Sequence, residues 1–598
     1  MSTLAFMKNL LIILFLTCSG VFYAQDQQLA YDYYRKGEFE KSASIYQSLY
    51  EQNNFNSNYF TRLIYCYRQL EDYSKTQEII EQHLEKFPSQ IQFYVELGYN
   101  YELQYNHTKA KEFYDRAIQG LEERQSYGYS VGRAFQNNHL LDYALQSYRI
   151  IMQANPNANF NIQIATIYGE KGELENMFNS YLDMVEKNEK YRTTILRYVG
   201  KYITDDSENE YNVLFKRLLL KRLQTNQLNA WNQLLSWLFM QQKQYGRAFV
   251  QEKALHLRNR DSIGLTGIKT LGEIAFNNED YSTSKNCFSY VLENAENPVE
   301  TIDAKLFLLY VLIETESELT IIDNNFQELF SEYGINSNTI DIQVAYADFL
   351  TFKKGESKKS IDILKNALNF RSDEFQKGSI KIKLGDVLVF RGQFNEALIY
   401  YSQVQTKLKN HILAQEARFK VAQTSFYKGD FKWAQTQLKV LKGSTSQLIA
   451  NDALDLSLII DDNTVQDSLK TALKLYAKAD LLAFQNKNKE ATDTLNVILT
   501  EHKGHAIEDE TLFKQAEIFE KMNLLDQAES NYLKLIALNA EDILVDDAYF
   551  KLAELYFKQN NTEKAQEYYQ KIIFDFPSSI HLVEARKKYR TLRGDDLQ

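Results

Sequence analysis

The sequence predicts an all-α solenoid built from antiparallel helix pairs stacked one after another, and three observations predict it. First, 598 residues are more than one hydrophobic core can hold, so the chain has several domains or a repetitive array. Second, it contains only 4 prolines and 22 glycines, too few for the turns of an all-β or α/β protein of this length. Third, pairs of mostly small residues twelve positions apart return at steps of 34 or 37 residues, a period typical of helical repeats.

Each predicted repeat is two amphipathic helices of about three turns joined by a short turn. One residue of each pair lies on the first helix and the other on the second, where small side chains let the two helix axes approach. The turns "YRKGEFEKS" and "FRGQFNEA" supply Gly37 and Gly392, which can take the left-handed conformation that ends a helix. The paired positions are Ala30/Ser42, Ile64/Thr76, Gly98/Ala110, Gly132/Ala144, Ser236/Ala248, Gly272/Ser284, Gly385/Ala397, Ala422/Ala434, Ala479/Ala491, Ala516/Ala528 and Ala553/Ala565.

Packing explains much of the tyrosine content, which at 41 residues is unusually high. Large side chains fill the space that the small ones leave, and tyrosine occupies two fixed phases of the repeat. It follows the small position of the first helix by three residues at Tyr33, Tyr67 and Tyr101. It follows that of the second helix by four residues at Tyr46, Tyr114, Tyr148, Tyr401, Tyr532 and Tyr569. We expect these rings in the core of the array.

Residues 1–24 have the layout of a secretory signal peptide. Lys8 precedes an apolar run from Leu10 to Leu16, and small residues lead to a cleavage point after Ala24. The apolar run is too short to span a bilayer, and no later stretch is long and apolar enough to do so. We therefore expect an exported protein.

Two alternatives concern this leader. Translation from Met7 instead of Met1 would give a shorter leader of the same type. Lipid attachment at Cys18 is the other alternative, although Phe15-Leu16-Thr17 before it fits a lipobox poorly. The other two cysteines, Cys66 and Cys287, fall in distant repeats, so we expect two separate buried thiols and no disulfide.

The repeat resembles the tetratricopeptide repeat, whose signature is Leu-Gly-x-x-Tyr on the first helix, then Ala, an aromatic residue four later and a closing Pro. "ELGYNY…KAKEFYDRAI" and "KLGDVLVFRGQFNEALIYYSQV" match most of these positions. The resemblance implies a right-handed superhelix of antiparallel helix pairs. The first helix of each pair would line its concave face.

The signature divides the chain into regions. We expect a tetratricopeptide array over residues 25–190, an irregular helical or degenerate region over 191–340, and a second array over 341–598 that ends in a capping helix. In the second array, 57 residues separate Ala434 from Ala491 where 37 would be regular. An extra helix around "NDALDLSLII" is the expected insertion.

The final unit, which ends in "FPSSIHLVEARKKYRTLRG", is similar to the C-terminal repeats of bacterial envelope proteins. These include outer-membrane assembly lipoproteins and periplasmic coordinators of cell constriction. The Asn-, Lys-, Ile- and Tyr-rich usage is typical of Bacteroidetes. The resemblance implies a periplasmic location, or one at the periplasmic face of the outer membrane.

Candidate binding residues lie beside the small position of the first helices, or at related phases, where side chains point into the concave groove. Tyrosine gives a large contact area at low entropic cost, which suits peptide recognition. The alternative is that the rings pack laterally between repeats. No Asn follows the small position, so the Asn-based carboxylate clamp of chaperone-docking repeats is not expected. The predicted groove residues are Tyr31, Tyr34, Tyr65, Arg68, Tyr99, Tyr129 and Arg133.

The predicted function is a non-catalytic scaffold that binds envelope proteins or peptides, in envelope assembly or secretion. A net charge of −11 with no long basic run argues against nucleic acid, and nothing indicates a cofactor or a small-molecule substrate. Peripheral association with the outer membrane is compatible with this prediction.

Three alternatives stay open. The arrays could self-associate as a structural element, or an unrecognised enzyme site could lie in residues 191–340. A metal site could also be built from Glu501, His502, His505 and Glu508. Solvated loops between repeats collect such residues, and we do not predict a metal there.

Overall fold

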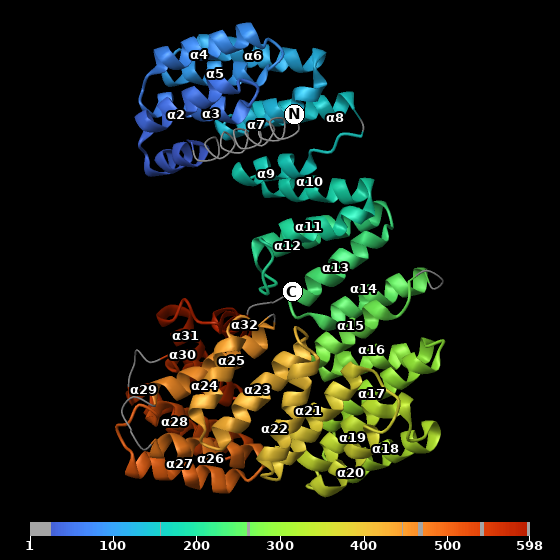
Figure 1. Cartoon of the computed structure of the whole chain (residues 1–598). Coiled ribbons are helices and arrows are strands. Elements are labelled where there is room, and N and C mark those ends of the chain that lie inside the picture. The colour runs from blue at the N-terminus through green and yellow to red at the C-terminus, as the bar shows by residue number, and fades with distance from the viewer. Residues whose placement is uncertain are drawn as a thin grey trace, which may run out of the picture. The chain divides into compact units, whose positions relative to one another are not determined.

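The computed structural model describes residues 26–155, 157–259, 263–444, 446–463, 470–538 and 543–594. The predicted signal peptide and Cys18 lie outside these residues. Every regular element in the described part of the chain is a helix, and consecutive helices pack as antiparallel pairs (Figure 1). The predicted fold class, an all-α solenoid of helix pairs, is confirmed.

The chain forms two compact units. The first comprises residues 1–202 and 217–230, and the second comprises residues 203–216 and 231–598. The boundaries predicted at residues 190 and 340 concern the regularity of the repeats and stay a prediction.

A helix over residues 26–36 opens the first unit. It is followed by α2 (Phe39–Gln52), α3 (Ser57–Gln69), α4 (Tyr73–Lys86), α5 (Gln92–Leu103), α6 (His107–Glu123), α7 (Gly128–Asn137), α8 (Leu141–Ala154), α9 (Asn161–Glu170), α10 (Leu174–Lys187), α11 (Arg192–Val199) and α12 (Glu210–Thr225), with short 3-10 turns at Gln125–Tyr127 and Glu189–Tyr191. The helix α12 spans the division between the units.

In the described part of the second unit, twenty helices follow. They are α13 (Asn229–Gln241), α14 (Tyr245–Arg258), α15 (Thr266–Asn277), α16 (Tyr281–Asn294), α17 (Pro298–Thr315), α18 (Leu319–Tyr333), α19 (Ile340–Phe352), α20 (Ser357–Ala367), α21 (Glu374–Phe390), α22 (Phe394–Lys407), α23 (Ile412–Tyr427), α24 (Phe431–Leu441), α25 (Gln447–Asp462), α26 (Thr471–Phe484), α27 (Asn488–Glu501), α28 (Glu508–Lys521), α29 (Leu525–Leu538), α30 (Val545–Lys558), α31 (Thr562–Asp575) and α32 (Leu582–Arg593). The helix α25 is the expected insertion, and it packs against α23 and α24.

The small residues of the first helices face an aromatic ring of the second. A Cβ added to Gly98 would lie 2.5 Å from Cε1 of Tyr114, and one added to Gly385 would lie 2.4 Å from Cε1 of Tyr401. Gly37 and Gly392 adopt φ angles of +76° and +73°, as the turn sequences predict.

Alanine in place of two helical glycines is expected to have opposite effects. Gly385→Ala should destabilise the second unit by about 1–3 kcal/mol, because the ring of Tyr401 cannot move away easily. Its hydroxyl donates a hydrogen bond of 2.7 Å to buried Asp386. Gly246→Ala should be neutral or stabilising by up to about 1 kcal/mol, since an added Cβ would meet only Oγ1 of Thr283 at 3.7 Å. Urea unfolding of both variants tests this, and equal effects would contradict the packing argument.

The second unit carries a regular ladder of ion pairs between its repeats. A lysine two residues before the small position of one first helix, or two residues before Arg590 in α32, meets a carboxylate one residue after the small position of the preceding first helix. The pairs are Lys383 with Asp348, Lys420 with Asp386 (3.3 Å), Lys514 with Asp480 (2.9 Å), Lys551 with Glu517 (3.7 Å) and Lys588 with Glu554 (2.6 Å). We call these five pairs the lysine ladder.

Repeats far apart in sequence also touch within this unit, which simple stacking does not predict. The ring of Phe484, at the end of α26, lies 5.4 Å from that of Phe352. Nε2 of Gln485 donates a hydrogen bond of 2.9 Å to the carbonyl of Phe390, 95 residues away. Cys66 and Cys287 are free and buried, one in each unit, as predicted.

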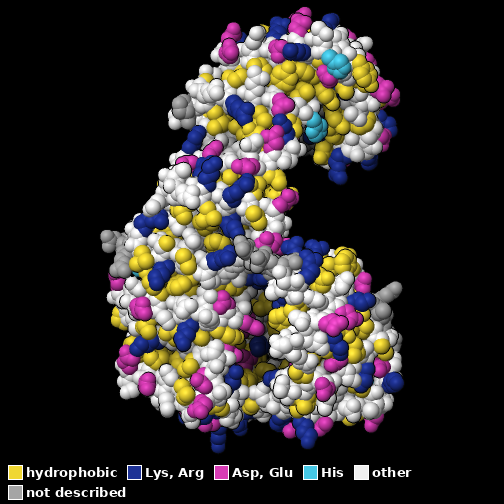
Figure 2. All heavy atoms as spheres, turned by 180° about the vertical axis from the view of Figure 1, so that it is seen from behind, with side chains coloured by type: hydrophobic (Ala, Val, Ile, Leu, Met, Phe, Trp, Pro, Cys, Tyr) yellow, Lys and Arg dark blue, Asp and Glu magenta, His cyan; other side chains and the backbone are white. Residues whose placement is uncertain are grey.

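The surface offers no extended field of one charge on the face that Figure 2 shows. Lysine and arginine side chains are interspersed there with aspartate and glutamate, and hydrophobic side chains lie scattered among them. Of the helices that the structure describes, none combines the length and apolar character needed to cross a bilayer.

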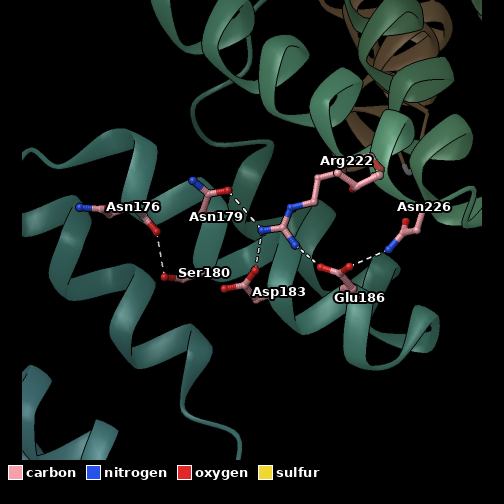
Figure 3. A network of polar contacts seen from close by, with 8 residues as sticks. Asn176, Asn179, Ser180, Asp183, Glu186, Arg222 and Asn226 are labelled. Carbon is pink, nitrogen blue, oxygen red and sulfur yellow. Dashed lines mark hydrogen bonds and ion pairs between the residues drawn. The ribbon is translucent and has the colours of Figure 1, made fainter.

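Polar contacts dock α12 onto α10 where the repeat signature is lost (Figure 3). The guanidinium of Arg222, which is 16% exposed, donates to Oδ1 of Asp183 at 2.5 Å, to Oδ1 of Asn179 at 3.2 Å and to Glu186. Arg217 forms a second ion pair with Glu175 at 2.9 Å. The acidic stripe of α10 is therefore matched by arginines of α12, where a regular repeat would present small and aromatic residues.

Candidate functional site

A cavity of about 710 Å³ opens on the first unit, and four predicted groove residues line it. They are Tyr34, Tyr65, Arg68 and Tyr99, from the helix over residues 26–36, α3 and α5. The end of α7 and the turn after it complete the wall with Asn137, Asn138 and His139. First helices of successive repeats supply these side chains, as the resemblance implies. We call this cavity the N-terminal groove.

Tyrosines of the N-terminal groove both pack on each other and remain open to solvent. The ring of Tyr34 lies 5.1 Å from that of Tyr65 and 6.3 Å from that of Tyr31. Tyr65 is 41% exposed, and Tyr31, which lies beside the groove and lines a neighbouring cavity instead, is 38% exposed. The rings therefore pack laterally between repeats and still present a face to solvent. Whether they bind a partner stays a prediction.

The phenol of Tyr34 is harder to ionise than a free phenol. Burial raises the pKa of Tyr34, and the neighbouring Tyr65 raises it further, while the positive charge of Arg62 opposes both effects. The side chain of Tyr34 thus offers the groove an apolar face and a neutral hydroxyl group.

Arg68 is part of the groove floor. It is 9% exposed, and its Nη1 donates to Oε2 of Glu96 at 2.7 Å. Glu96 is 7% exposed and also accepts a hydrogen bond of 3.2 Å from Nδ2 of Asn138. The guanidinium carbon of Arg68 lies 5.0 Å from the ring centre of Tyr99. Arg68 therefore joins three repeats, and its charge is compensated by Glu96.

Tyr129 and Arg133 do not line this cavity. Nη1 of Arg133 donates to the hydroxyl of Tyr129 at 2.9 Å, and the ring of Tyr129 stacks on Phe160 with centres 6.5 Å apart. The structure therefore separates these two candidates from the other groove residues.

Arg62 is the groove residue that the sequence reasoning missed. It lines the N-terminal groove and also a neighbouring cavity of about 420 Å³, which Tyr31 and Tyr59 line as well. Its guanidinium carbon lies 4.8 Å from the ring centre of Tyr31 and 5.1 Å from that of Tyr34. The sequence could have indicated Arg62 as a groove residue, because it stands two residues before Ile64, the small position of α3.

A buried histidine lies in the core beside the groove helices. His83, on α4, is 2% exposed and stacks on Phe60 with ring centres 4.1 Å apart. Its Nδ1 is 2.6 Å from the hydroxyl of Tyr50, and its Nε2 is 3.2 Å from Oε1 of Gln90. Burial lowers the pKa of His83, although the contact with Gln90 opposes this shift.

Acidification is therefore expected to destabilise the first unit. The pKa of His83 is lower in the folded state than in the unfolded state, where it is about 6.5, so the unfolded chain binds the proton more readily. Stability should be fully present above pH 6.5 and fall as the pH drops below it. Hydrogen exchange of α3, α4 and α5 from pH 7.5 to 5.5 measures this. His83→Phe should flatten the dependence, and the exposed His107→Gln should not; an unchanged slope in H83F would contradict the assignment.

The four residues considered for a metal are arranged as a turn. The rings of His502 and His505 have centres 5.2 Å apart, and Oε2 of Glu508 accepts a hydrogen bond of 2.6 Å from the backbone N–H of Gly504. Across the described part of the chain, no group of three or more His, Cys, Asp or Glu side chains is placed to hold a metal ion.

Comparison with known proteins identifies one repeat directly. Residues 547–579, over α30 and α31, match the family model of the tetratricopeptide repeat. A comparison with curated protein sequences gives no match.

Two solved structures are similar over almost the full length of both chains. One is described as the APC/C hetero-tetramer Cut9-Hcn1, with 12% identity, a TM-score of 0.26, and coverage of 95% of this chain and 96% of that chain. The other is described as Naa15/Naa10 bound to HypK-THB, with 11% identity, a TM-score of 0.30, and coverage of 96% and 97%. TM-scores this low support no inference about function. The helix pairs, the register of their small residues and the match at residues 547–579 make the chain an all-α solenoid of the tetratricopeptide-repeat type.

Proposed function

We propose that this chain is a non-catalytic scaffold that binds a segment of a partner protein in the N-terminal groove. The observation that carries the proposal is the open aromatic cavity of about 710 Å³, which successive first helices line with half-exposed tyrosines. Tyrosine rings on a rigid helical framework lose little entropy on binding, and they supply both apolar contact and hydrogen bonds. An extended or helical segment is the expected ligand.

The proposed setting is the bacterial cell envelope, in assembly or secretion. The leader-like residues 1–24 support export, and the similarity of the last repeat to envelope proteins supports the periplasm or the inner face of the outer membrane. The partners would then be envelope proteins, with peripheral membrane association through them.

Crosslinked capture from cell envelopes tests the proposal. The bait is the mature chain, compared with a Tyr34→Ala/Tyr65→Ala variant that circular dichroism shows to be folded. Tyr129→Ala is the matched control, because Tyr129 is 45% exposed and lies outside the groove. We expect the double variant to lose a defined set of proteins that the control retains.

Two results would contradict the proposal. Equal capture by all three baits would remove the groove as the binding face. Sedimentation of the mature chain as a tight homo-oligomer that captures no foreign protein would favour the self-associating structural element.

A further inference from the structure

Arg62 occupies a position of the repeat at which a lysine is paired with a carboxylate elsewhere in the chain. In four of the five pairs of the lysine ladder, a cation two residues before the small position meets a carboxylate of the preceding repeat. In the fifth pair, Lys588 stands two residues before Arg590 and meets Glu554. Arg62 stands at the same place, two residues before Ile64. The corresponding residue of the preceding repeat is Tyr31, one residue after Ala30. A tyrosine therefore stands where the second unit places its carboxylates.

The contacts of Arg62 agree with this register. Its guanidinium carbon lies 4.8 Å from the ring centre of Tyr31, 5.1 Å from that of Tyr34 and 6.0 Å from that of Tyr46. Contacts with ring faces hold a guanidinium in place without cancelling its charge. Within the described residues, no aspartate or glutamate forms an ion pair with Arg62.

Other charges of the N-terminal groove leave Arg62 uncompensated. The second arginine, Arg68, is paired with Glu96 at 2.7 Å. Glu71 also lines the groove. It follows the end of α3, nine residues beyond Arg62, which is about 13 Å along a helix axis. The groove thus carries one positive charge at the end where the tyrosines lie.

We propose that Arg62, with the rings of Tyr31 and Tyr34, forms a subsite for a carboxylate of the bound partner segment. The carboxylate is the side chain of an aspartate or glutamate, as it is at the same register of the lysine ladder. This inference rests on the proposed function and states which segments the groove selects. The guanidinium offers two parallel N–H donors to such a group, and the flanking rings exclude water from the contact. An apolar residue next to the carboxylate would pack on Tyr65.

This subsite differs from the Asn-based clamp that the sequence argues against. It uses an arginine before the small position instead of an asparagine after it. A net charge of −11 still disfavours strongly acidic partners as a whole. A single carboxylate at a fixed place in the segment is the expected feature.

The test uses short random peptides displayed in two formats, one with a free C-terminus and one with the C-terminus blocked by fusion. Peptides are selected on the mature chain, and their affinities are then measured for Arg62→Gln, Arg62→Lys and Arg116→Gln. Arg116 is the matched control, because it is exposed and its guanidinium carbon lies 4.4 Å from the ring centre of Tyr94, outside the groove.

The expected result is a selected set with one carboxylate at a common position. Arg62→Gln should weaken binding about tenfold or more, Arg62→Lys should weaken it less, and Arg116→Gln should leave it unchanged. A glutamine in place of the peptide's acidic residue should weaken binding to the natural chain by a similar factor. The same substitution in the peptide should weaken binding to R62Q only slightly further. Both display formats should give this result, and peptides that depend on Arg62 only when their C-terminus is free would overturn the side-chain assignment.

Other outcomes separate the two proposals. Peptides that depend on Tyr34 and Tyr65 but lack a common carboxylate, or that R62Q binds as well, would overturn the subsite and leave the scaffold function standing. Failure to select any peptide that depends on Tyr34 and Tyr65 would overturn both. The substitution within the peptide keeps the test decisive even where R62Q is poorly folded.

Discussion

Asp386→Ala is expected to destabilise the second unit by about 3–5 kcal/mol, as the loss of one partner from a buried charge network does. Asp386 is 6% exposed and accepts a hydrogen bond of 2.7 Å from the hydroxyl of Tyr401. Its carboxylate also lies 3.3 Å from Nζ of Lys420 and 3.8 Å from Nζ of Lys383. Alanine would leave two largely buried ammonium groups and a phenol without their shared acceptor.

Tryptophan fluorescence isolates this effect. The chain has 3 tryptophans, at positions 231, 237 and 433, and all lie in the second unit. Urea unfolding followed by their emission should show a large shift of the midpoint in D386A. Glu374→Gln alters an exposed carboxylate that pairs with Lys407 at 2.9 Å, and it should leave the midpoint almost unchanged. Similar midpoints for both variants would mean that the network is solvated and contributes little.

The pH dependence of the same network has a defined sign. Burial alone would raise the pKa of Asp386, but Lys420 and Lys383 outweigh burial, and the hydrogen bond from Tyr401 acts with them, so the pKa is lowered. A carboxyl whose pKa is lower in the folded state adds stability that is complete above its unfolded pKa of about 4. This contribution should be lost as the pH falls below that value, and D386A should lack it.

Periodicity made the fold predictable, because spacing within a helix pair is a local property. Gly98 and Gly385 could be recognised from sequence as positions where a first helix lies close to the aromatic ring of its partner. The lysines of the lysine ladder, for example Lys383 and Lys420, also recur at one phase of the repeat. The carboxylates that pair with them belong to the preceding repeat, however. Pairing across repeats depends on the superhelical geometry, which local spacing does not define.

The candidate site was predictable only in part, for the same reason. Tyr65 and Tyr99 could be placed in one groove, because residues at equal phases of successive repeats align along the concave face, and Tyr34 was at a related phase. Tyr129 was at a related phase, yet its hydroxyl accepts a hydrogen bond from Arg133, away from the cavity. The roles of the groove arginines depended on contacts between repeats, such as the one between Arg68 and Glu96, which are 28 residues apart.

Arg68→Ala is expected to destabilise the first unit by about 3–5 kcal/mol, since it leaves the carboxylate of Glu96 buried without its cation. Glu96 is 7% exposed and would keep only the contact with Asn138. Circular dichroism follows both units, whereas tryptophan emission follows the second alone. In R68A the first unit should unfold at a lower urea concentration than in the natural chain. This transition should appear by circular dichroism and be absent from tryptophan fluorescence.

A paired substitution decides whether charge burial is the cause. Arg68→Leu combined with Glu96→Leu removes both charges and should recover much of the lost stability, because a buried ion pair replaced by apolar residues is often neutral. Failure of the double variant to recover would mean that packing against Tyr99 is the larger contribution. If R68A loses partner binding and the double variant does not, the loss results from a destabilised groove floor. The two arginines of the groove are separable on this basis: Arg68 positions the repeats that carry the tyrosines, and Arg62, whose charge no described carboxylate balances, is the one available to a ligand.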